Sequence, residues 1–413
     1  MRINQAFRYE LKPHVAQRIL LAKHAGTARF AYNWGLAERI KLFESKEGKE
    51  KFTTAAAQHK TINALKSTEY PWMYEVSKCA PQEALRDLEK AFKNFFSGRK
   101  AGRNVGFPKF KKKGGHDSFR LTGSIKVNSR SVQLPRLGKL RTKEATGKFK
   151  GQILSATVTT EADRWFVSLS VEVERAEPLP VKGDITGIDV GLTSFAALSD
   201  GTKVDAPKLV KKAAKKLKRR SKQHSRKVKG SNNRRKSAHK LARLHRQVKN
   251  HRRDFLHKLS TKLAKTKSVV VIEDLCVKGM IRNRKLSAAI ADAGWAEFRA
   301  MLAYKTQWYG SELVIAPRFF ASSKTCSHCN HVMEALPLDI REWECPYCGT
   351  HHDRDVNAAN NLVKWFLENT ESSSGINACG DSSTGDDAKV SSRHGSLLAL
   401  AKRGAFSAPR TQC

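Results

Sequence analysis

The sequence lacks long apolar runs. None of its apolar stretches approaches the roughly 18 residues that a membrane-spanning helix requires. Its first residues, MRINQAFRYELK, mix charged and apolar side chains where a signal peptide would need an unbroken apolar stretch. We therefore expect a soluble, cytoplasmic protein that has no membrane partner.

Acidic residues are also scarce. The 413 residues include 38 Asp and Glu against 78 Lys and Arg, which gives a formal net charge of +40. A charge of this size attracts polyanions, and nucleic acid is the most abundant polyanion inside a cell, with a membrane surface as the weaker alternative. Because 40% of the residues are hydrophobic, the chain can bury the cores of two or three domains, which argues against a purely disordered basic protein.

Residues 206–253 contain no acidic residue and 21 Lys and Arg. The second half of this segment, with the residues that follow it, has apolar positions at helical spacing, so we expect a long helix with one apolar stripe and basic flanks. A charge run can simply be a solvated surface, but 21 bases without one acid favour phosphate binding. The candidate nucleic-acid-binding residues are Lys211, Lys212, Lys215, Lys216, Arg219, Arg220, Arg234, Arg235, Arg243 and Arg246.

Four of the eight cysteines fall within 23 residues. Two Cys-x-x-Cys pairs, separated by fifteen residues, have the spacing of a zinc ribbon in which four thiolates hold one tetrahedral ion. Four protein ligands leave no open position for water, so we expect a structural site. The predicted zinc ligands are Cys326, Cys329, Cys345 and Cys348; the nearby His328, His331, His351 and His352 are expected outside the ligand set.

Three acids occupy positions that suggest a second kind of metal site. Asp189 interrupts an apolar strand, Glu273 ends one, and Asp355 opens a helix. A carboxylate in an apolar strand is costly unless it faces a cleft or a cation. Two Mg²⁺ ions need clustered carboxylates to hydrolyse a phosphodiester. Singly, each acid could be a surface or capping carboxylate, and Asp355 in particular could cap its helix; together they favour a catalytic site.

The periodicity predicts a mixed α/β chain. We expect a short strand at 6–11, helices up to about residue 97, and antiparallel strands from about 117 to 174 that form a barrel or small sandwich. A β-hairpin follows within ITGIDVGLTSFAALSDGTKV, with Asp189 in the middle of its first strand. Further strands are expected at 268–272 and 312–315, a helix at 355–366, and a low-complexity tail after about residue 370.

Several motifs resemble the TnpB (OrfB) proteins of bacterial and archaeal insertion sequences, which are relatives of the type V CRISPR effector nucleases. The motifs are GIDVGLTSFAALSDG, IEDLCVKGMIRNRKLSAAIADAGWAEFRAMLAYK, SSKTCSHC, CPYCGTHHDRDVNAANN, ARFAYNWGLAERI and GFPKFKKK. One departure is Asn330, where the family usually has Gly after the first zinc knuckle. Because Asn also tolerates positive φ, we expect the knuckle to form.

The resemblance implies an α/β multi-domain protein: a RuvC-like, RNase H-fold nuclease domain with an inserted zinc ribbon, and an N-terminal β-barrel with an inserted helical domain. The implied boundaries are 1–12 and 116–182 for the wedge-like barrel, 13–115 for the helical recognition domain, 183–321 and 351–369 for the nuclease domain with a basic helical insertion at 206–265, 322–350 for the ribbon, and 370–413 for a flexible tail.

The implied function is RNA-guided cleavage of DNA in a prokaryotic cell, as an accessory to transposition. The family's acids fall on Asp189, Glu273 and Asp355, with Asp353 as the alternative third acid, and they imply catalytic Mg²⁺. The implied partners are a guide RNA from the end of the element and target double-stranded DNA with a short flanking motif, bound by a monomer. The basic segment would bind the guide RNA or its heteroduplex.

Other functions remain to be weighed against this one. A guide-dependent DNA-binding regulator would not need the three acids. A transposase that itself joins DNA would need a tyrosine nucleophile and a His-apolar-His metal pair, and the chain has no such His pair. A ribosomal-type zinc-ribbon protein does not explain the length or the acids. Phe107 and Phe110, in the basic GRNVGFPKFKKKGG segment, could stack on bases, but core packing is the favoured interpretation.

Overall fold

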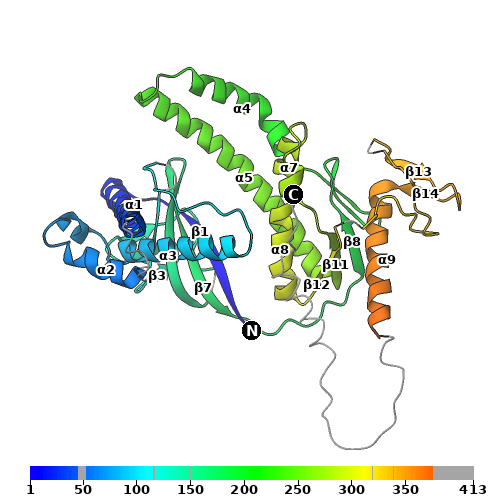
Figure 1. Cartoon of the computed structure of the whole chain (residues 1–413), viewed down its shortest axis with the longest axis horizontal. Coiled ribbons are helices and arrows are strands. Elements are labelled where there is room, and N and C mark those ends of the chain that lie inside the picture. Colours follow the sequence, from blue (N-terminus) through cyan, green and yellow to red (C-terminus); the bar gives the residue numbers. More distant parts are fainter. Residues whose placement is uncertain (45–52, 115–116, 149, 319, 338, 375–413) are drawn as a thin grey trace, which may run out of the picture. The chain divides into compact units, whose positions relative to one another are not determined.

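The computed structural model describes residues 1–44, 53–114, 117–148, 150–318, 320–337 and 339–374. The chain divides into two compact units, Met1–Glu177 and Pro178 onward. Figure 1 shows both units, coloured along the sequence. Each unit has its own sheets, helices and hydrophobic core, so each is described separately.

The first unit contains two antiparallel sheets. The larger sheet has the order β1-β7-β6-β2, and the smaller has the order β3-β4-β5. They meet where the end of β1 continues beside β5, because the backbone N–H of Lys12 donates to the carbonyl of Arg141 at 2.7 Å and Leu11 bridges Thr142. The strands are β1 (Arg2–Leu11), β2 (Ser118–Leu121), β3 (Lys126–Asn128), β4 (Ser131–Leu134), β5 (Gly138–Arg141), β6 (Gln152–Glu161) and β7 (Arg164–Glu174).

Helices are inserted between β1 and β2. The long helix α1 packs along α3, and their contact is close because the position of Gly35 leaves no room for a side chain: an added Cβ would lie 2.6 Å from Leu85. Leu21, Leu36 and Leu88 join the strand residues in one core. The elements are α1 (Val15–Glu44), α2 (Ala55–Ala64), the 3₁₀ turn η1 (Pro71–Glu75) and α3 (Cys79–Lys100).

The second unit is built on a five-stranded mixed sheet with the order β10-β9-β8-β11-β12. Strands β8, β9 and β10 are antiparallel neighbours, whereas β11 lies parallel to both β8 and β12. The central position of β8 explains its apolar sequence. The strands are β8 (Ile185–Asp189), β9 (Ser194–Leu198), β10 (Lys203–Asp205), β11 (Val269–Glu273) and β12 (Glu312–Ala316).

Helices cover both faces of this sheet. On one face, Ile188, Val270 and Ile272 pack with buried residues of α5 (Asn232–Thr266) and α8 (Trp295–Tyr309). On the other face, Val271 packs against Leu362 of α9 (Arg354–Ser374). Because side chains alternate along a strand, Asp189 and Glu273 belong to the face covered by α9.

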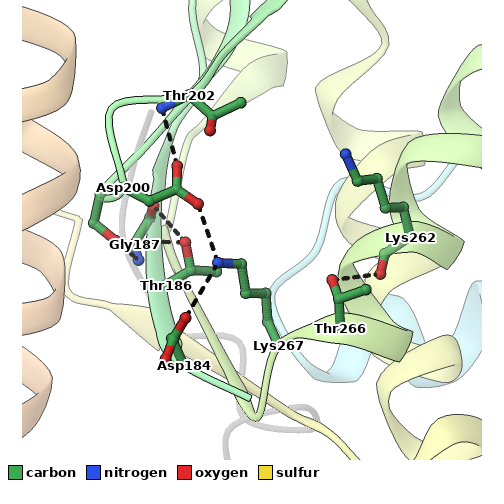
Figure 2. A network of polar contacts seen from close by, with 9 residues as sticks. Asp184, Thr186, Gly187, Asp200, Thr202, Lys262, Thr266 and Lys267 are labelled. Carbon is green, nitrogen blue, oxygen red and sulfur yellow. Dashed lines mark hydrogen bonds and ion pairs between the residues drawn. The ribbon is translucent and has the colours of Figure 1, made fainter.

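A polar network fixes the start of β8 (Figure 2). Lys267, which follows α5, places its Nζ 3.1 Å from Asp200 and 4.0 Å from Asp184. Asp200 also accepts a hydrogen bond of 2.9 Å from the backbone N–H of Thr202, which closes the turn between β9 and β10. This network joins the end of α5 to the strand that carries Asp189 at its other end.

The basic segment forms a helical hairpin. Helix α4 (Leu209–Ser225) packs against α5 within the second unit, and Figure 1 shows the two side by side. No residue of α4 is buried, whereas α5 buries Leu244, Leu256, Leu259 and Leu263. The predicted long basic helix with one apolar stripe is therefore confirmed as α5.

Most predicted strands are confirmed, with shifts of boundary. The strand expected at 6–11 begins at Arg2, and those expected at 268–272 and 312–315 are β11 and β12. Asp189 is not in the middle of the first strand of a hairpin, as the sequence predicts, but is the last residue of β8. The single hairpin expected from the pattern is three strands, β8, β9 and β10, and its predicted turn, Ser199–Gly201, joins β9 to β10. The last helix runs on to Ser374; the rest of the expected tail, 375–413, lies outside the described residues.

No helix in the described ranges is both long and apolar enough to cross a membrane.

Gly187 in β8 should be intolerant of any side chain. An added Cβ would lie 1.9 Å from the carbonyl oxygen of Ala359, so Gly187→Ala must push α9 away from the sheet. We expect a loss of about 2 to 3 kcal/mol in stability, measured as a lower melting temperature. Gly106→Ala is the matched control, because nothing lies within 4 Å of its added Cβ; equal melting temperatures for the two variants would contradict the close packing of α9.

Candidate active site and metal centre

Asp189 and Glu273 end two neighbouring parallel strands. The register pairs Ile188 of β8 with Ile272 of β11, so the next residues along, Asp189 and Glu273, are opposite one another. The carboxyl ends of parallel strands meet at one edge of the sheet, and both acids face the side that α9 covers. The fold therefore brings together two acids that are 84 residues apart in the sequence.

Asp355 lies in the first turn of α9. Its Oδ1 is 3.5 Å from a guanidinium nitrogen of Arg341, and its side chain is 16% exposed. Asp353, two residues earlier, has other contacts: it accepts a hydrogen bond of 3.1 Å from the backbone N–H of Val356 and forms an ion pair with Lys203. Asp353 is therefore the N-cap of α9, the position that the sequence suggested for Asp355.

The pKa of Asp189 reflects the proximity of these acids. Burial is the largest cause that raises this pKa, and the negative charges of Glu273 and Asp355 raise it further, to about 7. The positive charge of Arg354 and a hydrogen bond from the backbone of Val190 oppose the shift. A carboxyl with this pKa is balanced between its protonated and charged forms near neutral pH, and a bound cation would favour the charged form.

Polar partners hold the side chain of Glu273. The hydroxyl of Ser322, which is 5% exposed, donates a hydrogen bond to Glu273 Oε1. The next residue, Asp274, points to different partners and forms ion pairs with Arg299 and Arg318. Burial raises the pKa of Asp274, but the hydrogen bonds and positive charges of Arg299 and Arg318 together outweigh burial and lower this pKa below its ordinary value.

The three carboxylates form a looser group than the cysteines. Within the described ranges, the four cysteines are the one set of three or more metal-binding side chains whose ligand atoms all lie within 4.8 Å of one another. The oxygens of Asp189, Glu273 and Asp355 are thus spread more widely, although their charges interact. Oxygen donors of this kind suit Mg²⁺, and side-chain rotation would be needed for all three to share one ion.

The four predicted zinc ligands come together. The sulfurs of Cys326 and Cys348 are 3.7 Å apart, and those of Cys329 and Cys345 are 3.6 Å apart. Four sulfurs at about 2.3 Å from a tetrahedral zinc ion would be separated by about 3.8 Å, so the cluster fits zinc. His352 Nε2 lies 3.0 Å from the sulfur of Cys326. At this distance its N–H can donate a hydrogen bond to the Cys326 thiolate while the thiolate binds zinc.

Both knuckles close with tight turns. The backbone N–H of Asn330 donates to Cys326 O at 3.0 Å, and that of Gly349 donates to Cys345 O at 2.8 Å. Asn330 and Gly349 have φ of 65° and 67°. The expectation that Asn can replace Gly in the first knuckle is confirmed.

Two buried asparagines join the ribbon to α9. The side chain of Asn357 accepts a hydrogen bond of 2.9 Å from the backbone of Ser327 and donates one of 2.8 Å to Thr325 O. Asn361 donates to the carbonyls of Ser322 and Thr325 at 2.7 and 2.6 Å. Both asparagines are 1% exposed. The chain that leads into the zinc cluster is thus fixed to the helix that carries Asp355.

Sequence reasoning missed Ser322, Asn357 and Asn361. A signal for the asparagines was present, because they lie four residues apart on the face of α9 that also carries buried apolar residues. Ser322 had no such signal.

The candidate phosphate-binding residues differ in accessibility. Most are exposed on α4 and α5, but Arg220 and Arg234 are half-buried and Arg246 is 9% exposed. Arg234 donates to the carbonyl of Lys227 at 2.8 Å and so holds the turn between α4 and α5. The accessible members are Lys211, Lys212, Lys215, Lys216, Arg219, Arg235 and Arg243.

A shallow depression of about 390 Å³ does not coincide with the acids. It is lined by residues that include Asp184, Lys267 and Lys364, beside the start of β8. Asp189 lies four residues further along that strand, about 13 Å away.

Comparison with protein families gives three matches. Residues 168–284 match the OrfB_IS605 family, described as "Probable transposase", and residues 295–362 match the Cas12f1-like TNB domain. Residues 1–49 match a family described as a helix-turn-helix domain. In the structure the described part of that last range is a strand, β1, followed by a single long helix, α1.

Curated relatives cover nearly the whole chain. A protein of Streptomyces pristinaespiralis named "Putative RNA-guided DNA endonuclease" is 38% identical over 390 residues, which cover 92% of each chain. InsQ of Escherichia coli K12, with the same description, is 33% identical and covers 87% of this chain and 91% of its own. The chain belongs to the TnpB (OrfB) family, and the family resemblance of its motifs is confirmed.

A solved structure shares the fold. The protein in a Cas12f1–sgRNA–target DNA complex superimposes with a TM-score of 0.51 at 14% identity, over 87% of this chain and 98% of that one. The chain therefore has the mixed α/β fold of a Cas12 effector, with a four-cysteine cluster that fits zinc.

Replacement of Cys326 by Ser should remove bound zinc. We expect one zinc per chain in the intact protein and none in the variant, together with lower solubility, because the ribbon has little other core and metal binding supplies much of its folding free energy. Cys276→Ser, outside the cluster, is the control and should keep its zinc. The check is metal content by mass spectrometry; a Cys326→Ser protein that retains stoichiometric zinc would contradict the assignment.

Proposed function

We propose that the protein is an RNA-guided DNA endonuclease in which Asp189, Glu273 and Asp355 form a RuvC-like, Mg²⁺-dependent hydrolytic site. The observation that carries the proposal is the position of the first two acids on adjacent parallel strands, with the third acid acting electrostatically on Asp189. The names of the relatives from Streptomyces and Escherichia support the same activity.

The topology of the second unit supports a RuvC-like, RNase H-fold domain. That fold is expected to have three antiparallel strands followed by two parallel ones, with helices on both faces of the sheet. Asp189 ends the first of these five strands, and Glu273 ends the fourth. In the first unit, the two linked sheets with helices inserted after β1 suit a wedge-like barrel with a helical recognition domain.

The donor set fits magnesium. Three carboxylates supply the oxygen ligands that Mg²⁺ prefers, and the raised pKa of Asp189 marks a site where a cation would relieve repulsion. When bound there, Mg²⁺ would supply Lewis-acid activation of water and charge stabilisation of the leaving 3′ oxygen. We assign the metal-holding role to Asp189, Glu273 and Asp355.

Other residues of the chain orient these ligands. Ser322 restrains the carboxylate of Glu273, and Arg341 restrains that of Asp355. The zinc ribbon supports both restraining residues, Ser322 and Arg341, because Asn357 and Asn361 fix the ribbon to α9. We assign zinc a structural role, since four sulfurs fill its coordination shell.

The α4–α5 hairpin would bind the phosphates of the guide RNA and of its heteroduplex with target DNA. Its exposed Lys and Arg offer charge without base specificity, so base pairing with the guide would select the target and the protein would read a short flanking motif. The solved relative was determined with an sgRNA and target DNA, which supports these partners. We further propose that the protein acts as a monomer and assists transposition by cutting DNA.

Asp189→Asn should abolish cleavage and leave nucleic-acid binding nearly unchanged. Asparagine keeps the shape of the side chain but removes a charge that the metal needs, whereas the phosphate-binding residues lie on another element. The measurement is guide-dependent cleavage of a matched plasmid, with binding measured in parallel by gel shift. Retained cleavage would overturn the proposed site, and binding with no cleavage in the unaltered protein would favour a DNA-binding regulator.

Asp355→Asn and Asp353→Asn should differ in effect. The first should abolish cleavage, because Asp355 acts on Asp189. The second should retain cleavage and lose less than about 1 kcal/mol of stability, because Asn still accepts the capping hydrogen bond from Val356 but cannot form the ion pair with Lys203. The two variants are compared in the same cleavage assay and by thermal unfolding; the reverse pattern would make Asp353 the third acid.

Asp189→Asn should also stabilise the protein in the absence of divalent metal. The folded-state pKa of about 7 lies above the ordinary value of 3.8, so the protein loses stability as pH rises from about 4 to about 7, and the whole loss is present at higher pH. We expect the variant to melt a few degrees higher at pH 8 in EDTA, and by a smaller margin at pH 6.

Added Mg²⁺ should reverse this order, because it stabilises the intact site and not the variant. The check is a thermal melt of both proteins at the two pH values, with and without Mg²⁺. An Asp189→Asn protein that is less stable than the unaltered one under all four conditions would contradict a site that requires a cation.

A further inference from the structure

A second basic surface lies in the first unit, away from α4 and α5 in the sequence. The segment from Arg99 to Gly114, which begins in the last turn of α3, contains seven Lys and Arg and no acid. Almost all of its residues are exposed. We name the exposed rings and bases of this region the aromatic-basic surface: Phe96, Phe107, Phe110, Arg99, Lys100, Arg103, Lys109, Lys112 and Lys113.

Its phenylalanines are unusually accessible. Phe96, Phe107 and Phe110 are 41%, 43% and 51% exposed. Core packing was the expectation for Phe107 and Phe110, and it is wrong for both: Phe107 touches Phe92 and Phe95 edge-on, each at 5.4 Å between ring centroids, but keeps much of its surface free. Phe96 also contacts Phe92 and Phe95, so the exposed rings of Phe96 and Phe107 share two neighbours, and Phe110 follows three residues later in the same basic segment.

The backbone of the segment is fixed by contacts on both sides of Phe107 and Phe110. The N–H of Arg103 donates to Gly98 O at 2.8 Å, and Val105 fills the space beside Gly98, where an added Cβ would lie 2.4 Å away. Further along, the side-chain amide of Asn33 bonds both the N–H and the carbonyl of Lys111, at 2.8 and 3.0 Å. The rings are therefore presented from an ordered chain, which lowers the entropy cost of stacking a ligand on them.

We propose that the aromatic-basic surface binds unpaired nucleotides, with bases stacked on Phe107 and Phe110 and phosphates held by the neighbouring lysines. A ligand that matches this surface must be a polyanion that also presents flat apolar groups, and single-stranded nucleic acid combines the two. A duplex offers phosphates but keeps its bases stacked internally. The inference rests on the proposed function in one respect: it takes nucleic acid to be the partner of the protein.

The test uses the full-length protein and two fluorescent probes, a 20-nucleotide single strand and a 20-base-pair duplex, each without sequence relation to any guide. Binding is measured at about 0.3 M salt, because salt weakens the phosphate contacts of α4 and α5 far more than it weakens stacking. Under these conditions Phe110→Ala should weaken binding of the single strand about five- to thirtyfold and leave duplex binding nearly unchanged.

Further variants separate stacking from other roles. Phe110→Trp should bind the single strand as well as the unaltered protein, whereas Phe110→Leu, which keeps an apolar side chain, should lose affinity as Phe110→Ala does. Tyr74→Ala removes an aromatic side chain that is 59% exposed in the same unit and should have no effect. Lys112→Ala and Lys113→Ala together should reduce the salt dependence of binding for the single strand.

Each remaining outcome overturns the inference. Unchanged affinity of Phe110→Ala, or equal loss for both probes, would contradict stacking on unpaired bases. Loss of binding to anionic phosphatidylglycerol vesicles with no loss for the single strand would identify a membrane contact instead. Cleavage by the same preparations is scored separately, so a protein that cannot cut would count against the proposed function without affecting the comparison of variants.

Discussion

The carboxylate of Asp189 sets the main constraint on the second unit. It lies at the end of a central strand, desolvated and close to two other acids, where its charge is unfavourable without a cation. The packing around it keeps this arrangement in place: Gly187 lets α9 contact the sheet, two buried asparagines fix the zinc ribbon to α9, and Ser322 restrains Glu273. The four-cysteine cluster is thus connected to the acids through the chain between Cys326 and α9.

The three candidate catalytic acids and the basic segments lie on different elements of the chain. Asp189 and Glu273 lie at one edge of a sheet and Asp355 lies in the first turn of α9, whereas Lys and Arg extend along an exposed helical hairpin and along residues 99–114. Lysines and arginines at this density neutralise phosphates without reading bases. A protein built in this way needs another source of sequence specificity, and pairing with a guide strand would provide it.

Sequence patterns predicted much of this arrangement because its signals are local. The run SVVVIED indicated both β11 and Glu273, and the spacing of four cysteines predicted the metal cluster. Long-range contacts left no such signal. Asp353 and Asp355 both lie at the start of α9, and their difference depends in part on Lys203, 150 residues away. Ser322 restrains an acid 49 residues away and resembles any other serine in the sequence. Phe110 is apolar, so pattern alone placed it in a core.

The most direct test of a guided nuclease is to change the guide. The protein is purified from cells that carry its native locus, washed in high salt, and the retained RNA is sequenced; the variable end of that RNA is then rewritten and the complex is tested on plasmids that match the old or the new sequence. We expect one discrete RNA and Mg²⁺-dependent cleavage that follows the rewritten end. A heterogeneous mixture of RNA, or cleavage that ignores the guide, would contradict it.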